Sequence, residues 1–461
     1  MKCKKLLALL PLALLTSSLI GCDSGKTKVV FWHTMGSGLQ EVLDRMIKAF
    51  RKENPDIVIQ HAAQGDYDDL YDKISSAIPA GKTPTMAYCY PDHVADYNTS
   101  KACIDLTTYI NDTENGLAFT EEDGLTSDII EAYWKEGQEY LDQGVYSVPY
   151  AKSTELMFYN KSVFDAKGWT VPTTWEDMET LLATIVADPD YKGKEDFVPF
   201  GYDSDANFFI TMCEQYGIPY TSLNKELGKG SADFNNLAAK KMVTKLDQWY
   251  KAGYLKTQAT LGGSYTSTKF KEGDLLMTIG STGGTKYNYS ENFEVGVAQV
   301  PQPSTDPAKR FDFFTGTNVT PLPGANNNHI IMQGPSICFF KKGSDAQKIA
   351  AWKFYKFIVR TMNTAGWSTE SGYSPVRNSS FTCDAMVNYL NSKQTGEKGL
   401  IQQSVKLYSE LPSRYYVSPA FPGSSTCRKE VDGILANVFE GTKDLNQAFA
   451  DAYAKADFAI Q

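Results

Sequence analysis

Beyond its first 22 residues the sequence contains no uninterrupted apolar run of about 18 residues, so no membrane-spanning helix is predicted. It also lacks a dense cluster of basic residues, since 45 lysines and arginines are outnumbered by 54 acidic residues and the formal net charge is -9. Because neutralising a phosphate backbone needs clustered cations, nucleic acid is not expected as a partner. With 42% hydrophobic residues in 461, the chain still has enough apolar material for two or three domains.

Motifs for catalysis and metal binding are scarce as well. The four histidines are isolated and show no HExxH spacing, so no metal site is predicted. Gly81-Lys82-Thr83 resembles the end of a phosphate-binding loop, but the glycine required five residues earlier is Ser76, and no G-x-S-x-G motif occurs. The aspartates in residues 66–72 lack the glycine and glutamate of a calcium loop and fit a helix N-terminus better. No cofactor is predicted and no enzyme is expected, although composition leaves a glycosidase open.

The cysteines form no recognisable framework. Of the eight, Cys3 and Cys22 lie at the N-terminus, and the other six are irregularly spaced with no CxxC pair. An exported chain permits disulfides and an even number is compatible with them, but buried free thiols fit the sequence equally well. These six residues are Cys89, Cys103, Cys213, Cys338, Cys383 and Cys427.

The most informative local pattern lies at the N-terminus. Three early lysines precede an almost purely apolar run over residues 6–15, and Leu19-Ile20-Gly21-Cys22 closes the segment. This pattern resembles a bacterial lipoprotein signal peptide, because the apolar run is too short to span a bilayer and ends in small residues before a cysteine. It predicts residues 1–21 as the signal peptide, a lipidated Cys22, residues 22–28 as a tether, and a mature chain anchored by lipid to the extracytoplasmic face of the cell membrane.

The rest of the chain alternates strand-like and helix-like segments. Short β-prone runs alternate with apolar residues at helical spacing, and the order β-α-β-α-β near the start predicts a sheet covered by helices on both faces. Two α/β lobes around a cleft are the architecture that this pattern favours. Strands are expected at residues 28–32, 57–59, 86–88, 277–279, 295–300 and 337–340, helices at 42–50, 70–78, after Thr174, 345–358 and over most of 430–460, and a long loop or hairpin at 301–328.

A family resemblance rests on four separated stretches. They are residues 31–41, Phe158-Tyr159-Asn160-Lys161 followed by Pro172-Thr173-Thr174-Trp175, residues 270–278, and Gly372-Tyr373-Ser374-Pro375-Val376. Together they resemble the family 1 extracellular solute-binding proteins of ABC importers, over residues 29–461. Phe31-Trp32-His33-Thr34-Met35 and Gly65-Asp66-Tyr67 are most similar to the branch of that family that binds sn-glycerol 3-phosphate.

The resemblance implies a two-lobed α/β fold of the type II periplasmic-binding-protein class, similar to maltose-binding protein, with a hinge and an interlobe cleft. The chain is then expected to cross between lobes near residues 150, 285 and 360. This places residues 29–150 and 285–360 in the N-terminal lobe and residues 151–284 and 361–461 in the C-terminal lobe. A monomer that binds a small solute and presents it to two membrane permease subunits is expected.

The resemblance also implies a set of ligand contacts. A phosphate ester favours a guanidinium for paired charge-assisted bonds, together with neutral hydroxyl and amide donors, and the implied set contains these groups. The family's acidic contact falls at Pro91 here, with Asp92 adjacent, and residues 201–217 contain no tryptophan, so the polyol end of the site is expected to differ. The implied contacts are Tyr67, Asp92, Ser153, Ser281, Gly334, Tyr373 and Arg428.

Three functions follow from these observations. The favoured one is import of a carbohydrate-class solute, with glycerol 3-phosphate or a glycerophosphodiester ahead of the others. A receptor for a neutral sugar or oligosaccharide is the first alternative. A lipid-anchored extracellular glycosidase is the alternative from a different class.

Overall fold

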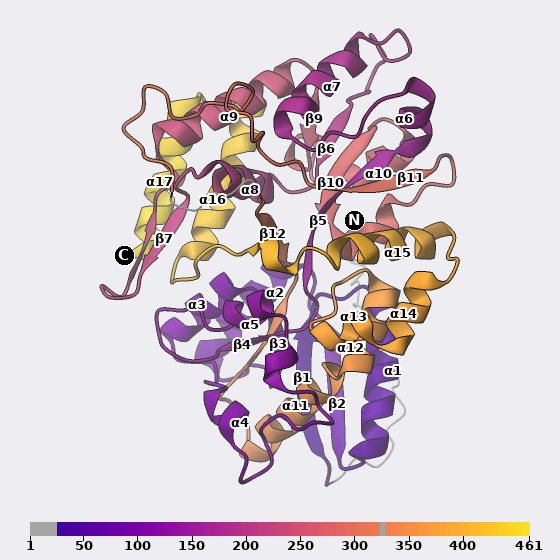
Figure 1. The fold of residues 1–461 in the computed structure, drawn as a ribbon. Coiled ribbons are helices and arrows are strands. Elements are labelled where there is room, and N and C mark those ends of the chain that lie inside the picture. The colour runs from indigo at the N-terminus through magenta and orange to yellow at the C-terminus, as the bar shows by residue number, and fades with distance from the viewer. Residues whose placement is uncertain (1–24, 323–327) are drawn as a thin grey trace, which may run out of the picture.

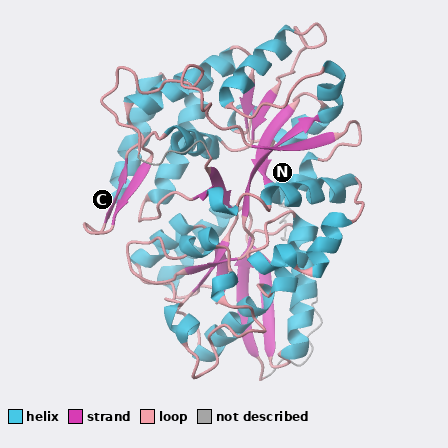
Figure 2. Ribbon diagram, viewed as in Figure 1, coloured by secondary structure: helices cyan, strands magenta, loops and turns pink. Residues whose placement is uncertain are grey.

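A computed structural model describes residues 25–322 and 328–461, so the signal segment, Cys22 and residues 323–327 of the 301–328 stretch lie outside the described residues. The described chain forms two lobes, each with its own β-sheet and its own hydrophobic core (Figure 1). In Figure 2 the two groups of strands are flanked by helices, as expected for a mixed α/β protein. The expected two-lobed α/β architecture is therefore confirmed.

The first lobe contains a five-stranded sheet in the order β2-β1-β3-β13-β4. β1 pairs in parallel with β2 and β3, whereas β13 runs antiparallel to β3 and β4. Its strands are β1 (Thr27–His33), β2 (Ile57–Ala63), β3 (Met86–Cys89), β4 (Ser147–Pro149) and β13 (Ser336–Phe339). Its helices are α1 (Ser37–Glu53), α2 (Tyr67–Ala80), α3 (Pro91–Thr99), α4 (Thr107–Asn111), η1 (Thr126–Asp128), α5 (Glu131–Glu136) and α11 (Asp345–Ile358).

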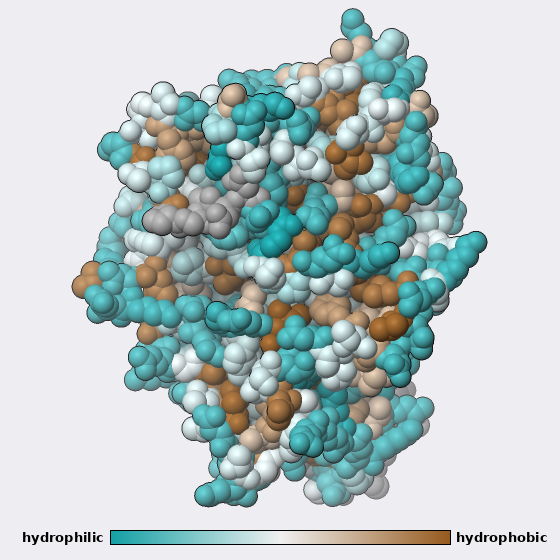
Figure 3. All heavy atoms as spheres, in the orientation of Figure 1, coloured by the Kyte–Doolittle hydropathy of each residue, from teal (hydrophilic) through white to brown (hydrophobic). Residues whose placement is uncertain are grey.

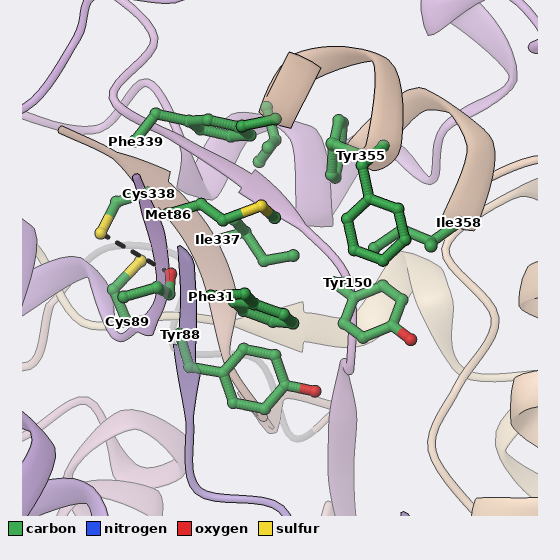
Figure 4. Packing of buried hydrophobic residues seen from close by; sticks show 14 of the residues in the cluster. Phe31, Met86, Tyr88, Cys89, Tyr150, Ile337, Cys338, Phe339, Tyr355 and Ile358 are labelled. Carbon is green, nitrogen blue, oxygen red and sulfur yellow. Dashed lines mark hydrogen bonds between the residues drawn. The ribbon is translucent and has the colours of Figure 1, made fainter. Parts of the chain in front are cut away.

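Apolar side chains on the central strands hold this sheet to its helices. Phe31 of β1, Met86 of β3 and Ile337 of β13 are fully buried and pack with Tyr355 and Ile358 of α11 (Figure 4). Removing these side chains from water supplies the main stabilising free energy of the lobe.

The second lobe is built around β5, which pairs with β10 on one side and with β11 and β12 on the other. Its strands are β5 (Ser153–Asn160), β6 (Phe200–Tyr202), β9 (Leu255–Thr257), β10 (Met277–Ser281), β11 (Val295–Gln299), β12 (Ile330–Gln333) and β14 (Tyr415–Tyr416), with a separate hairpin of β7 (Thr221–Asn224) and β8 (Lys229–Ala232). Its helices are α6 (Lys161–Lys167), α7 (Trp175–Ala187), α8 (Asp205–Tyr216), α9 (Leu237–Lys251), η2 (Ala259–Leu261), α10 (Thr266–Glu272), η3 (Thr282–Asn288), α16 (Ser424–Phe439) and α17 (Leu445–Ile460).

A third group of helices lies beside both lobes. It comprises α12 (Thr361–Ser371), α13 (Asn378–Thr382), α14 (Asp384–Asn391), α15 (Gly396–Tyr408) and η4 (Pro412–Arg414). α12 contributes Trp367 to the first core, whereas α15 packs Leu400 and Val405 against strands of the second sheet. These helices therefore connect the two lobes.

Several local predictions are confirmed. Residues 42–50 lie within α1, and Thr174 caps α7 by accepting a hydrogen bond from the Asp177 N–H at 3.1 Å. Asp66 and Asp69 form a reciprocal capping box at the start of α2, so the acidic cluster is a helix cap.

The structure differs from the expected lobe boundaries in two places, one of which is α12, expected in the second lobe but contributing Trp367 to the first core. The other is the segment 285–360, which is expected in the first lobe, whereas β11 and β12 within it pair with β5 of the second sheet. The chain returns to the first sheet only at β13, after Gly334. The periodicity of residues 295–300 predicts a strand correctly but carries no information about its partner, and β5 offers an edge on which β11 and β12 pair.

The six cysteines outside the N-terminal segment are free thiols, and all except Cys383 are buried. Among the described residues no helix is both long enough and apolar enough to cross a membrane. Hydrophilic residues cover most of the face in Figure 3, where hydrophobic residues occur in separate groups.

Candidate functional site

Aromatic residues from the first lobe lie where its parallel strands end. Tyr67 is the first residue of α2, directly after its cap, and Tyr90 follows β3 and immediately precedes α3. Their ring centroids are 4.7 Å apart. In open α/β sheets ligands bind outside the carboxyl ends of the strands, which is where these two rings lie.

Tyr373 joins the two rings from the connecting segment after α12. The Tyr67 hydroxyl interacts with the side chains of Thr34, Tyr90 and Tyr373, which surround it. Burial raises the pKa of Tyr67 and of Tyr373 well above the usual value, so both phenols are neutral donors at ordinary pH. Gly283 lies against the Tyr373 ring so closely that a β-carbon there would be 2.6 Å from it.

Two serines lie side by side on neighbouring strands of the second sheet. Ser153 is the first residue of β5 and Ser281 the last of β10, and the Ser281 hydroxyl donates to Ser153 Oγ at 3.2 Å. Ser281 Oγ also accepts from the Gly283 N–H at 3.2 Å, which links the serine pair to the glycine beneath Tyr373. The two hydroxyls therefore lie at adjacent strand ends on the same side of the molecule as Tyr373.

Gly334 lies in the segment through which the chain leaves the second sheet. Its φ is +78°, and a β-carbon would lie 2.0 Å from the Ala151 carbonyl oxygen, so both the backbone conformation and the space require glycine. The Lys152 ammonium donates to the Gly334 carbonyl oxygen at 2.7 Å. Gly334 is thereby held against the residues that precede Ser153.

Arg428 of α16 reaches the same region from the second lobe. Its guanidinium donates to the Asn207 side-chain oxygen, and Asn207 in turn donates to Glu155 Oε1 at 2.9 Å. The positive charge of Arg428 also acts on the Tyr90 hydroxyl. The second-lobe guanidinium thus interacts electrostatically with one first-lobe tyrosine, Tyr90.

Glu155 is a buried carboxylate that the sequence analysis did not identify. Only 1% of it is exposed, and it accepts hydrogen bonds from the Tyr202 hydroxyl, Asn207 and the Gln333 amide, the last at 2.8 Å. Burial raises the pKa of Glu155, while these hydrogen bonds and the charge of Arg428 oppose that rise. Successive side chains of a strand alternate between faces, so the position two residues after Ser153 was a signal that could have found Glu155.

Asp92 lies near this group but at its edge. Its carboxylate lies in the first turn of α3, where it accepts the His93 N–H at 3.0 Å, and its negative charge acts on Tyr90. Direct contacts and charge interactions thus connect the seven implied ligand contacts to one another. The same network includes three further residues, Tyr90, Glu155 and Asn207. Among the described residues no three histidine, cysteine or carboxylate side chains are placed to hold a metal ion.

This arrangement suits binding of a polar organic solute. A cation, several neutral hydroxyl donors, aromatic rings and a tightly positioned glycine converge from both lobes and from the connecting segment. The fold and these residues together define a two-lobed solute receptor.

Comparison with known proteins assigns the family. Residues 45–391, well over half of the chain, match the family model described as bacterial extracellular solute-binding protein. The chain belongs to this family and is a solute-binding protein of an ABC importer, whose partners are a small solute and membrane permease subunits.

Several relatives are similar over nearly their whole length. The sn-glycerol-3-phosphate-binding periplasmic protein UgpB of Escherichia coli K12 is 26% identical over 453 residues, which cover 95% of this chain and 94% of the relative. UgpB of Salmonella typhimurium is 24% identical over 438 residues, covering 92% and 91%.

Solved structures show the same fold. The GacH receptor of Streptomyces glaucescens, studied with acarbose, has a TM-score of 0.71 at 16% identity and covers 94% of this chain and 98% of its own. UgpB of Mycobacterium tuberculosis, solved with glycerophosphocholine, has a TM-score of 0.68 at 18% identity and covers 95% and 98%. At these identities the likeness concerns the fold.

Proposed function

We propose that this protein binds a glycerol phosphate ester, either sn-glycerol 3-phosphate or a glycerophosphodiester, and delivers it to its permease without chemical change. The observation that carries this proposal is Arg428, whose guanidinium donates to Asn207 and whose positive charge acts on the Tyr90 hydroxyl of the other lobe. A guanidinium can form two parallel charge-assisted bonds to a phosphate, and such bonds are about twice as strong as neutral ones.

The other residues supply complementary groups. The hydroxyls of Ser153 and Ser281 and the N–H of Gly334 are neutral groups that can donate to phosphate oxygens. Tyr67 and Tyr373 offer apolar faces for a carbon skeleton and hydroxyls for its oxygens. The relatives named for sn-glycerol 3-phosphate, similar over 95% of this chain, support the same assignment.

A neutral sugar is the second candidate, and one observation favours it. Glu155 is joined to Arg428 through Asn207, so part of the positive charge is already balanced by a buried carboxylate. Carboxylate and amide side chains are good acceptors and donors for sugar hydroxyls.

We expect the mature protein to be a monomer at the extracytoplasmic face of the membrane. Diacylglycerol and an N-acyl chain on Cys22 would hold it there, because two or more chains give stable attachment.

Substitution of Arg428 tests the phosphate assignment. A lost charge-assisted bond of about 1.5–3 kcal/mol corresponds to a 10- to 150-fold weaker affinity of Arg428→Ala for sn-glycerol 3-phosphate. Arg428→Lys should recover only part of this, since an ammonium lacks the planar two-donor fork.

Lys429→Ala is the matched control, because it removes the neighbouring exposed positive charge from the same helix. Its affinity, measured by calorimetry, should stay within about twofold of the wild type. Equal affinities of Arg428→Ala and Lys429→Ala would contradict the phosphate assignment.

A further inference from the structure

Helix α16, which carries Arg428, begins without a cap of its own. Gly423 precedes its first residue with φ +88° and provides no side-chain hydrogen bond. The first N–H groups of a helix have no partners within the helix and must find them elsewhere.

The partner comes from the other lobe. Asp96 of α3 accepts the Gly423 N–H on Oδ1 at 2.9 Å and the Ser425 hydroxyl on Oδ2 at 2.5 Å. The Tyr71 hydroxyl of α2 donates to the same Oδ2 at 3.0 Å and orients the carboxylate from within the first lobe. A negative charge at this position also complements the positive end of the α16 dipole.

The two helices belong to different lobes. α3 contributes Val94 and Tyr97 to the first core, whereas α16 contributes Val431 and Leu435 to the second. In Figure 1 α3 lies directly below α16, and residues of the two helices are in contact. The bonds of Asp96 therefore exist only while the lobes are together.

We propose that Asp96 is a latch that stabilises the closed form of the receptor and thereby positions Arg428 for the solute. This inference rests on the proposed function, in which the lobes close on a solute. When the lobes separate, the Asp96 carboxylate leaves α16, and the carboxylate and the N-terminal groups of α16 form hydrogen bonds with water instead. Since a solute that binds the closed form must overcome the cost of closing, a latch in that form increases the apparent affinity.

Other contacts near this edge are weaker. Lys225 of the β7–β8 hairpin pairs with Glu139 of the first lobe at 2.9 Å, but the two side chains are 51% and 48% exposed, so the pair contributes little. A cavity of about 180 Å³ beside the latch, lined by Asn98 and Pro422 among others, shows that the lobes do not pack tightly there.

The test compares variants of Asp96 with a control at the other interlobe contact. Loss of a helix cap predicts an affinity for sn-glycerol 3-phosphate about 3- to 30-fold weaker in Asp96→Ala, with an intermediate loss in Asp96→Asn, which keeps the side-chain shape and one acceptor. Glu139→Gln, which removes the exposed interlobe ion pair, should stay within about twofold.

A distance measurement separates the latch from the identity of the solute. Spin labels on cysteines placed at the exposed positions Ser100 and Glu226 report the separation of α3 from the hairpin. The background is Cys383→Ser, in which the other thiols of residues 25–461 that the structure describes are buried. Without any solute, Asp96→Ala and Asp96→Asn should shift the distribution to longer distances than wild type and Glu139→Gln.

The outcomes distinguish the two proposals. A shifted distribution in a protein that binds no phosphate ester would support the latch and contradict the proposed solute. The latch would be overturned if both Asp96 variants gave the wild-type distance distribution and bound sn-glycerol 3-phosphate within twofold of the wild-type affinity, where that affinity is measurable. Because Asp96→Asn preserves the side-chain volume, a folding failure of Asp96→Ala would leave the distances in Asp96→Asn to decide.

Discussion

A buried ion pair at the crossing between the lobes gives a quantitative prediction. Lys152, which is 0% exposed, donates to both oxygens of Glu136 at 2.8 and 2.7 Å, and Glu136 is 2% exposed. The same ammonium donates to the Gly334 carbonyl, and the Lys152 carbonyl accepts the Ser374 N–H at 2.6 Å. One residue therefore joins the start of β5 to the segments at Gly334 and Ser374.

Removing one partner leaves an uncompensated charge inside the protein. Lys152→Met should lower the free energy of unfolding by about 3–5 kcal/mol, because Glu136 would keep only the hydroxyl of Ser336, at 2.6 Å, among its present partners. Replacing both residues, as in Lys152→Met with Glu136→Gln, should cost less than the two single substitutions together, since no charge then remains buried.

Denaturant unfolding followed by circular dichroism measures these differences. The matched control is the exposed pair of Glu131 and Lys135, one helical turn apart, in which Lys135 Nζ lies 2.5 Å from Glu131 Oε1. Removing this pair should change the free energy of unfolding by only about 0.5 kcal/mol. A loss below about 1 kcal/mol for Lys152→Met, or strictly additive effects in the double variant, would refute this reasoning.

Three other variants or conditions give distinct results. Gly334→Ala should reduce solute affinity more than tenfold in calorimetry, because its β-carbon would meet the Ala151 carbonyl, and normal binding would contradict the close packing. Burial lowers the pKa of His33 to about 4. Between pH 6.5 and about 4 the unfolded state therefore binds a proton that the folded state does not, so the free energy of unfolding should fall by up to about 1.4 kcal/mol for each pH unit of acidification. An NMR titration that gives His33 a pKa near 6.5 would contradict this. Cys22→Ala should leave the protein uncleaved or released, whereas recovery of the wild type entirely in the medium would exclude a lipid anchor.

Much of the local structure could be predicted from the sequence because it depends on neighbouring residues. The apolar spacing over residues 42–50 predicts α1, and the aspartates at 66 and 69 cap α2 as helix-terminal charge. Sheet membership could not be predicted in the same way. Residues 295–300 show a strand pattern whether they pair with β5 or with a first-lobe strand, and only the assembled sheet decides.

The candidate site shows the same division. Arg428, Ser153 and Tyr373 were reached through family resemblance, and the structure brings them into one connected region. Glu155 and Tyr90 were missed, because their significance depends on Asn207, Gln333 and Arg428, which approach from distant parts of the chain. The position of Glu155 two residues after Ser153, on the same face of β5, was the available signal.

The most direct test of the proposed function is a calorimetric titration of the mature wild-type protein with sn-glycerol 3-phosphate and, in parallel, with maltose. We expect saturable binding of sn-glycerol 3-phosphate that weakens as ionic strength rises, because a charge-assisted bond to Arg428 is screened by salt. Tight maltose binding with no heat from sn-glycerol 3-phosphate would contradict the phosphate-ester assignment and favour a receptor for neutral sugars.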